Sequence, residues 1–501
     1  MEEKKLLFDV NEKPPIWQWI IMSFQHVFAM FGATVLVPIL VNAGIASAGV
    51  QGQALSIEVA LVSAGLGTLI YILCTRAKSP VFLGSSFAFI SPIIASYLAG
   101  SANNGGISGG IAGAMTGIMV VGLVYIIVSI LVRFIGKNWL DKVLPPIVIG
   151  PMIMIIGLGL ASSAVGNIFD VQYNEIPYAK VEYVDGIAKE IITDESVKIT
   201  DDSIIVTKET IDEETGKTII IKSVKQEKVS GAKWKGPIVA LITFMTTALV
   251  MTRAKGFFKI IPFLIGIIAG YLAACLAGLV DFGAIQTAYW IQMPKFYIPF
   301  VHYTPNIMIA LTMAPIALVT MAEHIGDHKA LSAILDRDLL KNPGLENTLL
   351  GDGIATFVAG AIGGPANTTY GENTSVVGMT KNASVWVIGL AAIFAIILGF
   401  LGKFTALVQT IPNSVLGGVS LLLYGFISVN GLKVLIQNKV DFTKNKNIII
   451  ASAMLVLGLG GAAFSIATGN GLSVQISGMS LAAIAGILLN LIIPDEENKV
   501  K

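Results

Sequence analysis

The sequence predicts an all-α polytopic membrane protein, and three observations carry this prediction. Of the 501 residues, 54% are hydrophobic and only 13% are charged, with a mean hydropathy of +0.77. Soluble globular domains carry about 25% charged residues, so most of this chain must be solvated by lipid. Apolar runs long enough to span a bilayer recur along the whole chain. A soluble enzyme is therefore excluded, and the net charge of +1 excludes a nucleic-acid binder held by phosphate contacts.

A membrane-spanning helix needs about 20 mainly apolar residues. The clear runs of this kind are, in order, 17–41, 59–74, 109–132, 145–164, 237–251, 260–279, 307–321, 385–401, 448–463 and 481–493. Other runs are shorter or interrupted, and we expect about twelve to fourteen segments in all. They are expected to be helices, because a closed barrel would show weak alternation over about ten residues per strand. Residues 1–13 are polar, so the first run is expected to span the membrane and not to be a signal peptide.

Lysine and arginine set the expected orientation, because they gather in cytoplasmic loops. Short connections rich in these residues lie at 76–78, 133–142, 253–259, 337–341 and 433–446. With these connections inside the cell, both the N-terminus (1–16) and the C-terminal tail (496–501) are cytoplasmic. Five crossings then place the segment 170–232 outside.

That segment is an acidic insert. Residues 170–230 hold 14 acidic residues and 8 lysines, unlike the apolar sequence on either side. The β-branched runs that flank residues 214–217 predict a β-hairpin. A solvated loop with no role in transport is favoured here over a specific binding function.

Two apolar segments are interrupted by glycine, proline and hydroxyl or amide residues, at 84–92 and 363–375. Irregular backbone at membrane depth is tolerated only where it is buried in protein or lines a cavity. A pair of such interruptions in corresponding halves of a chain is typical of the binding site of a transporter built from inverted repeats. We therefore expect the two segments to meet at a binding site.

The apolar run that begins at residue 307 continues into the sequence MAEHIGDHKA at 321–330, which contains two acidic residues. Glu323 and Asp327 are four residues apart, so they share one face of a helix. A carboxylate at the bilayer centre costs about 2.5–3.5 kcal/mol, which makes such residues functional candidates. The alternative is that the segment ends in solvent, and this alternative is favoured for His328 and Lys329.

Glu372 follows Tyr370 and Gly371 where the second broken segment restarts as a helix. A helix N-terminus offers free N–H groups, and a glutamate beside it adds acceptors. Together they suit a flat ligand with both N–H and C=O groups. The alternative is that Glu372 only caps its own helix.

Other chemistry has little support in the sequence. The four histidines and two cysteines have no metal-ligand spacing, and there is no nucleophile–base pair or nucleotide-binding glycine motif. We therefore expect no enzyme activity, no metal and no cofactor. Arginine is scarce and lies only at segment ends, which argues against an anion such as sulfate.

Five ordered motifs carry a family resemblance. They are QHVFAMFGATVLVP at 25–38, GSSFAFISP at 84–92, AEHIG at 322–326, NTTYGEN at 367–373 and GGVSLLLYG at 417–425. In these motifs the chain resembles the nucleobase–cation symporters of the nucleobase–ascorbate transporter family, and within it most closely the bacterial uracil permeases. The resemblance covers nearly the whole chain except the acidic insert.

The resemblance implies fourteen transmembrane segments in two inverted repeats of seven, with two short strand and half-helix segments at the site. The first repeat covers 17–169 and 233–300, and the second covers 301–495. Segments 1–4 and 8–11 form a core module, and segments 5–7 and 12–14 form a gate module. The implied activity is proton-coupled uptake of uracil across the cell membrane by alternating access, by a protein that is a homodimer.

The resemblance also implies roles for individual residues. The residues implied to bind the base are Glu323, Glu372, Phe87, Gly371, Tyr370, Ser86 and Ala33. Glu323 and Asp327 are implied to couple the proton, and the supporting residues are Gln25, His26, His324, Asn373 and Tyr424. Relatives that carry xanthine tend to have Gln at the position of Glu372, which favours uracil. Relatives that carry purines commonly have Asp at the position of Asp327, so a xanthine-type purine symporter stays an alternative, as does an anion transporter of the same architecture.

Overall fold

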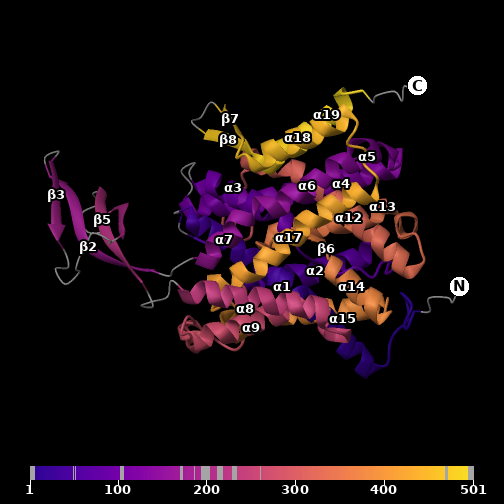
Figure 1. Cartoon of the computed structure of the whole chain (residues 1–501), viewed down its shortest axis with the longest axis horizontal. Coiled ribbons are helices and arrows are strands. Elements are labelled where there is room, and N and C mark those ends of the chain that lie inside the picture. The colour runs from indigo at the N-terminus through magenta and orange to yellow at the C-terminus, as the bar shows by residue number, and fades with distance from the viewer. Residues whose placement is uncertain are drawn as a thin grey trace.

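The computed structural model describes residues 6–48, 50, 52–101, 106–169, 173–184, 187–192, 204–211, 218–227, 234–259, 261–468 and 472–494. These residues are mostly helical, with three small antiparallel sheets. Most helices lie along the long axis of the molecule, and one sheet lies beyond one end of the helical body (Figure 1). We call that end the insert side. We call the opposite end, where Leu7 donates a backbone hydrogen bond to Lys381, the N-terminal side.

The first half of the chain runs back and forth between these two sides. Its elements before the insert are α1 (Ile16–Ser47), α2 (Ile57–Cys74), β1 (Leu83–Ser85), the 3-10 turn η1 (Phe87–Phe89), α3 (Ile90–Gly100), α4 (Gly106–Ile135), α5 (Asn138–Val143), α6 (Pro146–Gly159) and α7 (Ala161–Phe169). Those after the insert are α8 (Lys235–Arg253), η4 (Gly256–Lys259), α9 (Pro262–Leu276) and α10 (Gly283–Thr287). Helix ends follow local chemistry: Ser56 caps α2 by accepting a hydrogen bond from the Val59 N–H at 3.2 Å.

The second half of the chain contributes the remaining elements. Its elements are α11 (Ile307–Ala310), η5 (Leu311–Met313), α12 (Ala314–Leu335), η6 (Leu340–Gly344), α13 (Leu345–Ile362), β6 (Asn367–Thr369), α14 (Gly371–Thr380), α15 (Val385–Gly399), α16 (Gly402–Gln409), α17 (Asn413–Gln437), α18 (Asn445–Leu459), β7 (Ala463–Thr468), β8 (Leu472–Ser477) and α19 (Gly478–Ile492). Gly363 ends α13 with a φ of +87°, a left-handed conformation that glycine adopts without strain. This turn leads the chain into β6.

Seven stretches of described helix are long and apolar enough to cross a membrane, and five shorter apolar helices accompany them. The chain is therefore a multi-pass membrane protein. The predicted runs correspond to helices in every case. Two long helices, α13 and α17, were not among the clear runs, because glycine and polar residues interrupt them.

The helices pack in two groups. One group contains α1, α2, α3, α4, α12, α13, α14 and α15, and the other contains α6, α7, α8, α9, α17, α18 and α19. Each group has a close crossing between glycines. A Cβ on Gly353 of α13 would lie 3.0 Å from the Gly122 carbonyl oxygen of α4, and a Cβ on Gly431 of α17 would lie 2.5 Å from that of Gly150 in α6. Small residues permit such close packing of membrane helices.

The acidic insert contains the four-stranded sheet, with strand order β3-β2-β5-β4. The strands are β2 (Tyr173–Val184), β3 (Ile187–Ile192), β4 (Ile204–Ile211) and β5 (Thr218–Glu227). The two β-branched runs expected to form a hairpin are β4 and β5, and they pair antiparallel from Ile204 opposite Lys225 to Ile211 opposite Thr218. The predicted turn at 214–217 lies outside the described residues. The strands β7 and β8, which the sequence did not predict, also pair antiparallel.

Candidate functional site

The two broken segments meet in the middle of the helical body. β1 and β6 pair antiparallel, with Gly84 opposite Thr368, and every residue of both strands is buried. Each strand is followed by a helix, since η1 and α3 continue from β1 and α14 continues from β6. The structure thus joins two segments that lie almost 300 residues apart in the sequence. Their backbone polar groups are satisfied mostly by each other.

Tyr370 holds this junction together. Its hydroxyl donates to the Ser85 carbonyl oxygen at 2.9 Å and accepts from the Thr34 hydroxyl of α1 at 3.1 Å. Its ring lies against Gly84, where a Cβ would come within 2.4 Å of the ring atoms, so only glycine fits. Ala33 is buried in the same apolar cluster as Tyr370. Tyr370 and Ala33 therefore shape the walls of the junction.

Three carboxylates gather beside the strand pair. Glu323 and Asp327 project from α12, and Glu372 lies in the first turn of α14. Glu323 is exposed, whereas Asp327 and Glu372 are half-buried. The three groups are close enough to interact electrostatically. Helix spacing predicted that Glu323 and Asp327 share a face, and the family resemblance implied that Glu372 binds the base together with Glu323.

One of the three carboxylates, that of Asp327, has an identified hydrogen-bond partner. Asp327 Oδ2 accepts from the Thr369 hydroxyl of β6 at 2.6 Å, so Asp327 is not simply solvated at a helix end. Glu372 lies in the first turn of α14, whose N-cap position is occupied by Tyr370 without a side-chain cap hydrogen bond. Capping and ligand binding are compatible, because a carboxylate has lone pairs for more than one donor.

The N-terminus of α14 supplies donors at this place. The first N–H groups of a helix have no partner within the helix, and here the first turn begins at Gly371. Gly371 is exposed, and a Cβ atom added to it would lie 3.8 Å from Asp327 Oδ1. On the other strand, Ser86 is buried and Phe87 is half-buried where η1 contacts α12. The start of α14 and the start of η1 therefore both lie against α12, which carries two of the acceptors.

A buried network that the sequence did not predict lies behind Glu323. His324 Nδ1 is 2.9 Å from Asp352 Oδ2 of α13, and both side chains are fully buried. His328 Nδ1 is 2.7 Å from the His324 carbonyl oxygen, and the two rings stack with centroids 4.1 Å apart. A carbonyl oxygen only accepts, so His328 Nδ1 carries the proton.

His328 continues this network towards α2. Its Nε2 is 2.6 Å from the Tyr71 hydroxyl, which in turn lies 3.0 Å from the Ser79 hydroxyl. The expectation that His328 is solvated was therefore wrong, because its partner Tyr71 is remote in sequence. Lys329 is exposed, as expected. Asp352 could have been noticed as a lone acid within an apolar, glycine-rich run.

We expect the buried pair of His324 and Asp352 to be strongly coupled. In a double-mutant cycle with His324→Gln and Asp352→Asn, the coupling energy should be about 1.5–3 kcal/mol, the range for a hydrogen bond to a charged group. The measurement is denaturant unfolding of the detergent-solubilised protein.

The control pair is Asp9 and Arg337, which are half-exposed and 2.7 Å apart. Hydrogen bonding to Arg337 lowers the pKa of the Asp9 carboxyl, so this pair stabilises at neutral pH and is lost as the pH falls through that lowered pKa. Its coupling energy should stay below about 1 kcal/mol. Equal coupling in the two pairs would contradict the special role of the buried pair.

The residues expected to support the site do not all lie beside the three carboxylates. Asn373 of α14 donates to the carbonyl oxygen of His26 at 3.1 Å and lies 3.1 Å from its Nδ1, which ties α14 to α1. Gln25 Oε1 is buried and has no hydrogen-bond partner among the described residues. Tyr424 of α17 is buried against α6, where its carbonyl oxygen approaches Gly157. Tyr424 thus belongs to the other packing group.

The carboxylates are reached from the N-terminal side. On both helices, exposed residues recur every three or four positions from the carboxylates towards that side. They are Glu323, Gly326 and Ala330 on α12, and Gly371, Ser375 and Met379 on α14. Towards the insert side, the residues of α12 one turn before Glu323 are buried, with Val319 and Thr320 at 1% exposure or less. The site is therefore open in one direction.

Within the described residues, no group of three or more histidine, cysteine, aspartate or glutamate side chains is arranged to hold a metal ion.

Two broken segments that pair within a bundle of apolar helices, beside a row of acidic side chains, define a membrane transporter. The sequence profile described as "Permease family" matches residues 17–188 and 218–466. The chain belongs to this family, the nucleobase–cation symporters whose motifs it resembles.

Similar proteins match over nearly the whole chain. The "Uracil permease" of Bacillus subtilis (strain 168) is 41% identical over 501 residues, which are 100% of this chain and 98% of the relative. That of Bacillus caldolyticus is 40% identical, covering 98% and 95%. That of Escherichia coli (strain K12) is 37% identical, covering 96% and 93%.

Solved structures with the same fold are distant in sequence. The transmembrane domain of a cyanobacterium bicarbonate transporter, BicA, has a TM-score of 0.57 at 15% identity, covering 95% of this chain and 100% of that one. Murine Solute Carrier 26 family member A9, in the inward-facing state, has a TM-score of 0.59 at 10% identity, covering 96% and 69%. These similarities concern the fold alone.

Proposed function

We propose that this protein imports uracil across the cell membrane by alternating access, in symport with protons. The observation that carries the proposal is the match over nearly the entire chain to proteins named uracil permease from three bacteria, at 37–41% identity. The geometry of the site is consistent with it, because acceptors on α12 and α14 lie beside donors at two helix starts.

Uracil presents two ring N–H groups and two carbonyl oxygens. Glu323 and Glu372 accept from the N–H groups, and the backbone N–H groups at Phe87 and Gly371 donate to the oxygens. A base with a different edge leaves buried polar groups of the site unpaired, which costs about 1–3 kcal/mol for each group. Selectivity therefore follows from the alternation of donors and acceptors.

The two packing groups correspond to the core and gate modules. The core carries β1, β6 and the carboxylates, and the gate carries α6, α8 and α17. In this proposal fourteen segments form two inverted repeats, the termini are cytoplasmic, and two copies form a homodimer. Movement of the core against the gate carries the site from one side to the other, and the present opening towards the N-terminal side faces the cytoplasm.

Glu323, assisted by Asp327, carries the coupled proton. A proton carrier must bind its proton on one side of the membrane and release it on the other. Glu323 lies where the site opens, and Asp327 lies one helical turn beyond it on the same face. A membrane potential provides about 2.3 kcal/mol per charge per 100 mV, and a pH gradient provides about 1.4 kcal/mol per unit. Together they suffice for accumulation of several hundred-fold.

The test is uptake of labelled uracil into liposomes that contain the purified full chain, with an inside-alkaline pH gradient. We expect accumulation that a protonophore abolishes, with competition by unlabelled uracil and not by xanthine or sulfate. If unlabelled xanthine inhibited the uptake and unlabelled uracil did not, the purine symporter would be favoured. If labelled sulfate entered the liposomes and labelled uracil did not, the anion transporter would be favoured. Either result would overturn the proposal.

A further inference from the structure

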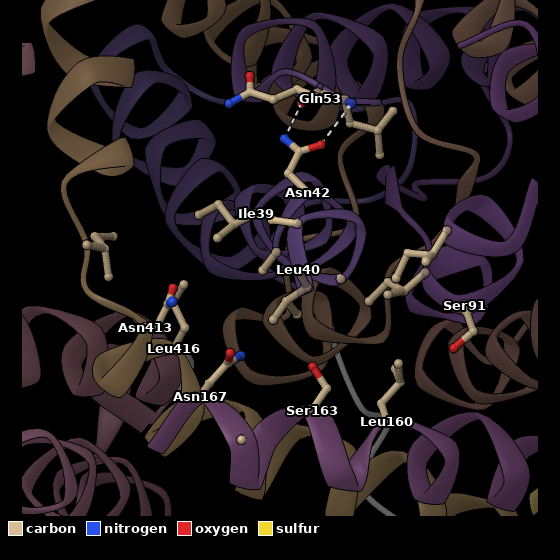
Figure 2. A pocket seen from close by; sticks show the side chains of 18 of the residues that line it. Ile39, Leu40, Asn42, Gln53, Ser91, Leu160, Ser163, Asn167, Asn413 and Leu416 are labelled. Atoms are coloured by element: carbon tan, nitrogen blue, oxygen red, sulfur yellow. Dashed lines mark hydrogen bonds between the residues drawn. The ribbon is translucent and has the colours of Figure 1, made fainter. Parts of the chain in front are cut away.

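A second cavity, distinct from the carboxylate site, opens on the insert side. Its volume is about 1130 Å³, which exceeds the roughly 300–1,000 Å³ of typical ligand pockets. One wall comes from α1 and the start of α2, a second from α3, and a third from α6, α7 and the start of α17. Figure 2 shows Asn167 and Ser163 of α7 directed into it, facing Leu40 and Ile39 of α1.

The lining of this cavity is polar but carries no charge. It contains amides and hydroxyls, among them Asn42, Gln53, Ser91, Ser163, Asn167 and Asn413, and among the described residues that line it none is acidic, basic or histidine. Such a lining can donate and accept hydrogen bonds yet gives no electrostatic advantage to an ion. It therefore favours a neutral molecule with amide-like edges.

One amide has an unsatisfied donor. Asn167 Nδ2 is buried and has no hydrogen-bond partner among the described residues. By contrast, Asn42 is fixed, because it donates to the Leu55 carbonyl oxygen at 2.7 Å and accepts from the Leu55 N–H at 3.3 Å (Figure 2). A buried donor without a partner costs free energy. Because Asn167 lines the cavity, a turn of its amide towards the cavity would let the carbonyl oxygen of a ligand satisfy this donor.

An apolar layer separates this cavity from the carboxylates. Leu40, Ile90 and Leu416 line the cavity and belong to one buried apolar cluster, against which Phe87 packs. Glu323, Asp327 and Glu372 do not line the cavity, and the exposed positions of α12 and α14 beside them run towards the other side. The cavity therefore ends about one helical turn from Phe87, where the base is proposed to bind.

We infer that this cavity is a second binding site for a neutral nucleobase, which holds the base on the insert side before it reaches the carboxylates. Asn167 donates to a carbonyl oxygen of the base. The inference rests on the proposed function, since it concerns the same substrate. Anionic molecules gain nothing from the lining, so the cavity also screens the substrate for charge.

The test is the variant Asn167→Leu, with Asn438→Leu as the matched control. Asn438 is exposed at the N-terminal side and donates only to the Val434 carbonyl oxygen within its own helix. Uptake of labelled uracil from outside should show a KM about 3- to 10-fold higher in Asn167→Leu, corresponding to the loss of one hydrogen bond. The maximal rate and the equilibrium Kd for uracil in detergent should stay within about twofold. Asn438→Leu should leave all three quantities unchanged.

The variant Asn167→Gln retains the donor and should restore much of the KM. An unchanged KM in Asn167→Leu would overturn the inference, as would a KM and a Kd that rise together, because Asn167 would then belong to the carboxylate site. Failure of the proposed function is a separate result, since the unmodified protein itself would then take up no uracil.

Discussion

Glu323→Gln is expected to abolish the accumulation of uracil against a gradient and to lower the initial rate of uptake about 100-fold. Glutamine keeps the shape of the side chain but binds no proton, and it places an N–H₂ group or a neutral oxygen where the carboxylate accepts from the base. The lost hydrogen bond to a charged group is worth about 1.5–3 kcal/mol, or roughly 10- to 150-fold in affinity. Uptake into liposomes with and without a pH gradient measures both effects.

The matched control is Glu346→Gln, because Glu346 lies in the first turn of α13, near the N-terminal side and away from the strand pair. It should accumulate uracil like the unmodified protein. A Glu323→Gln variant that still accumulates uracil in a pH-dependent manner would remove Glu323 as the proton carrier.

Glu372→Gln is expected to raise the KM for uracil about 10- to 100-fold, or to remove uptake altogether. The side chain lies in the first turn of α14, beside the free N–H groups of that helix. An amide there presents a donor to the ring N–H of uracil, so two donors face each other. The same change provides a donor for a base that has an acceptor at this edge, and competition by xanthine should therefore increase.

Competition of labelled uracil uptake by a panel of bases measures this shift in preference. Thermal unfolding of the variant in detergent is the control for folding, because a carboxylate in the first turn of a helix also stabilises that helix. Unchanged uptake kinetics in a folded variant would mean that Glu372 only caps its helix.

Hydropathy predicted most of the helices because lipid-facing helices must be apolar along their whole length. It did not single out α13 and α17, whose polar and glycine residues lie on buried faces. Asp352 and several glycines interrupt α13, and the pair Gly417–Gly418, serines and Tyr424 interrupt α17. Such residues are tolerated because protein, and not lipid, surrounds them.

The site was predictable in part. The broken segments were recognised because glycine and polar residues at membrane depth need a special environment, and Glu323 and Asp327 because they share a helix face. His328 was misjudged and Asp352 was missed. Their partners, Tyr71 and His324, lie 257 and 28 residues away in the sequence, and no local spacing contains that information.

The sequence by itself determined that this chain is a multi-pass helical membrane protein with two irregular segments, because solvation by lipid and the needs of the backbone act locally. Only the tertiary structure decided that β1 pairs with β6, that Glu372 joins the two carboxylates of α12, and that a neutral cavity lies on the opposite side of an apolar layer. Those arrangements depend on contacts between helices that are distant along the chain, and packing, not local composition, selects them.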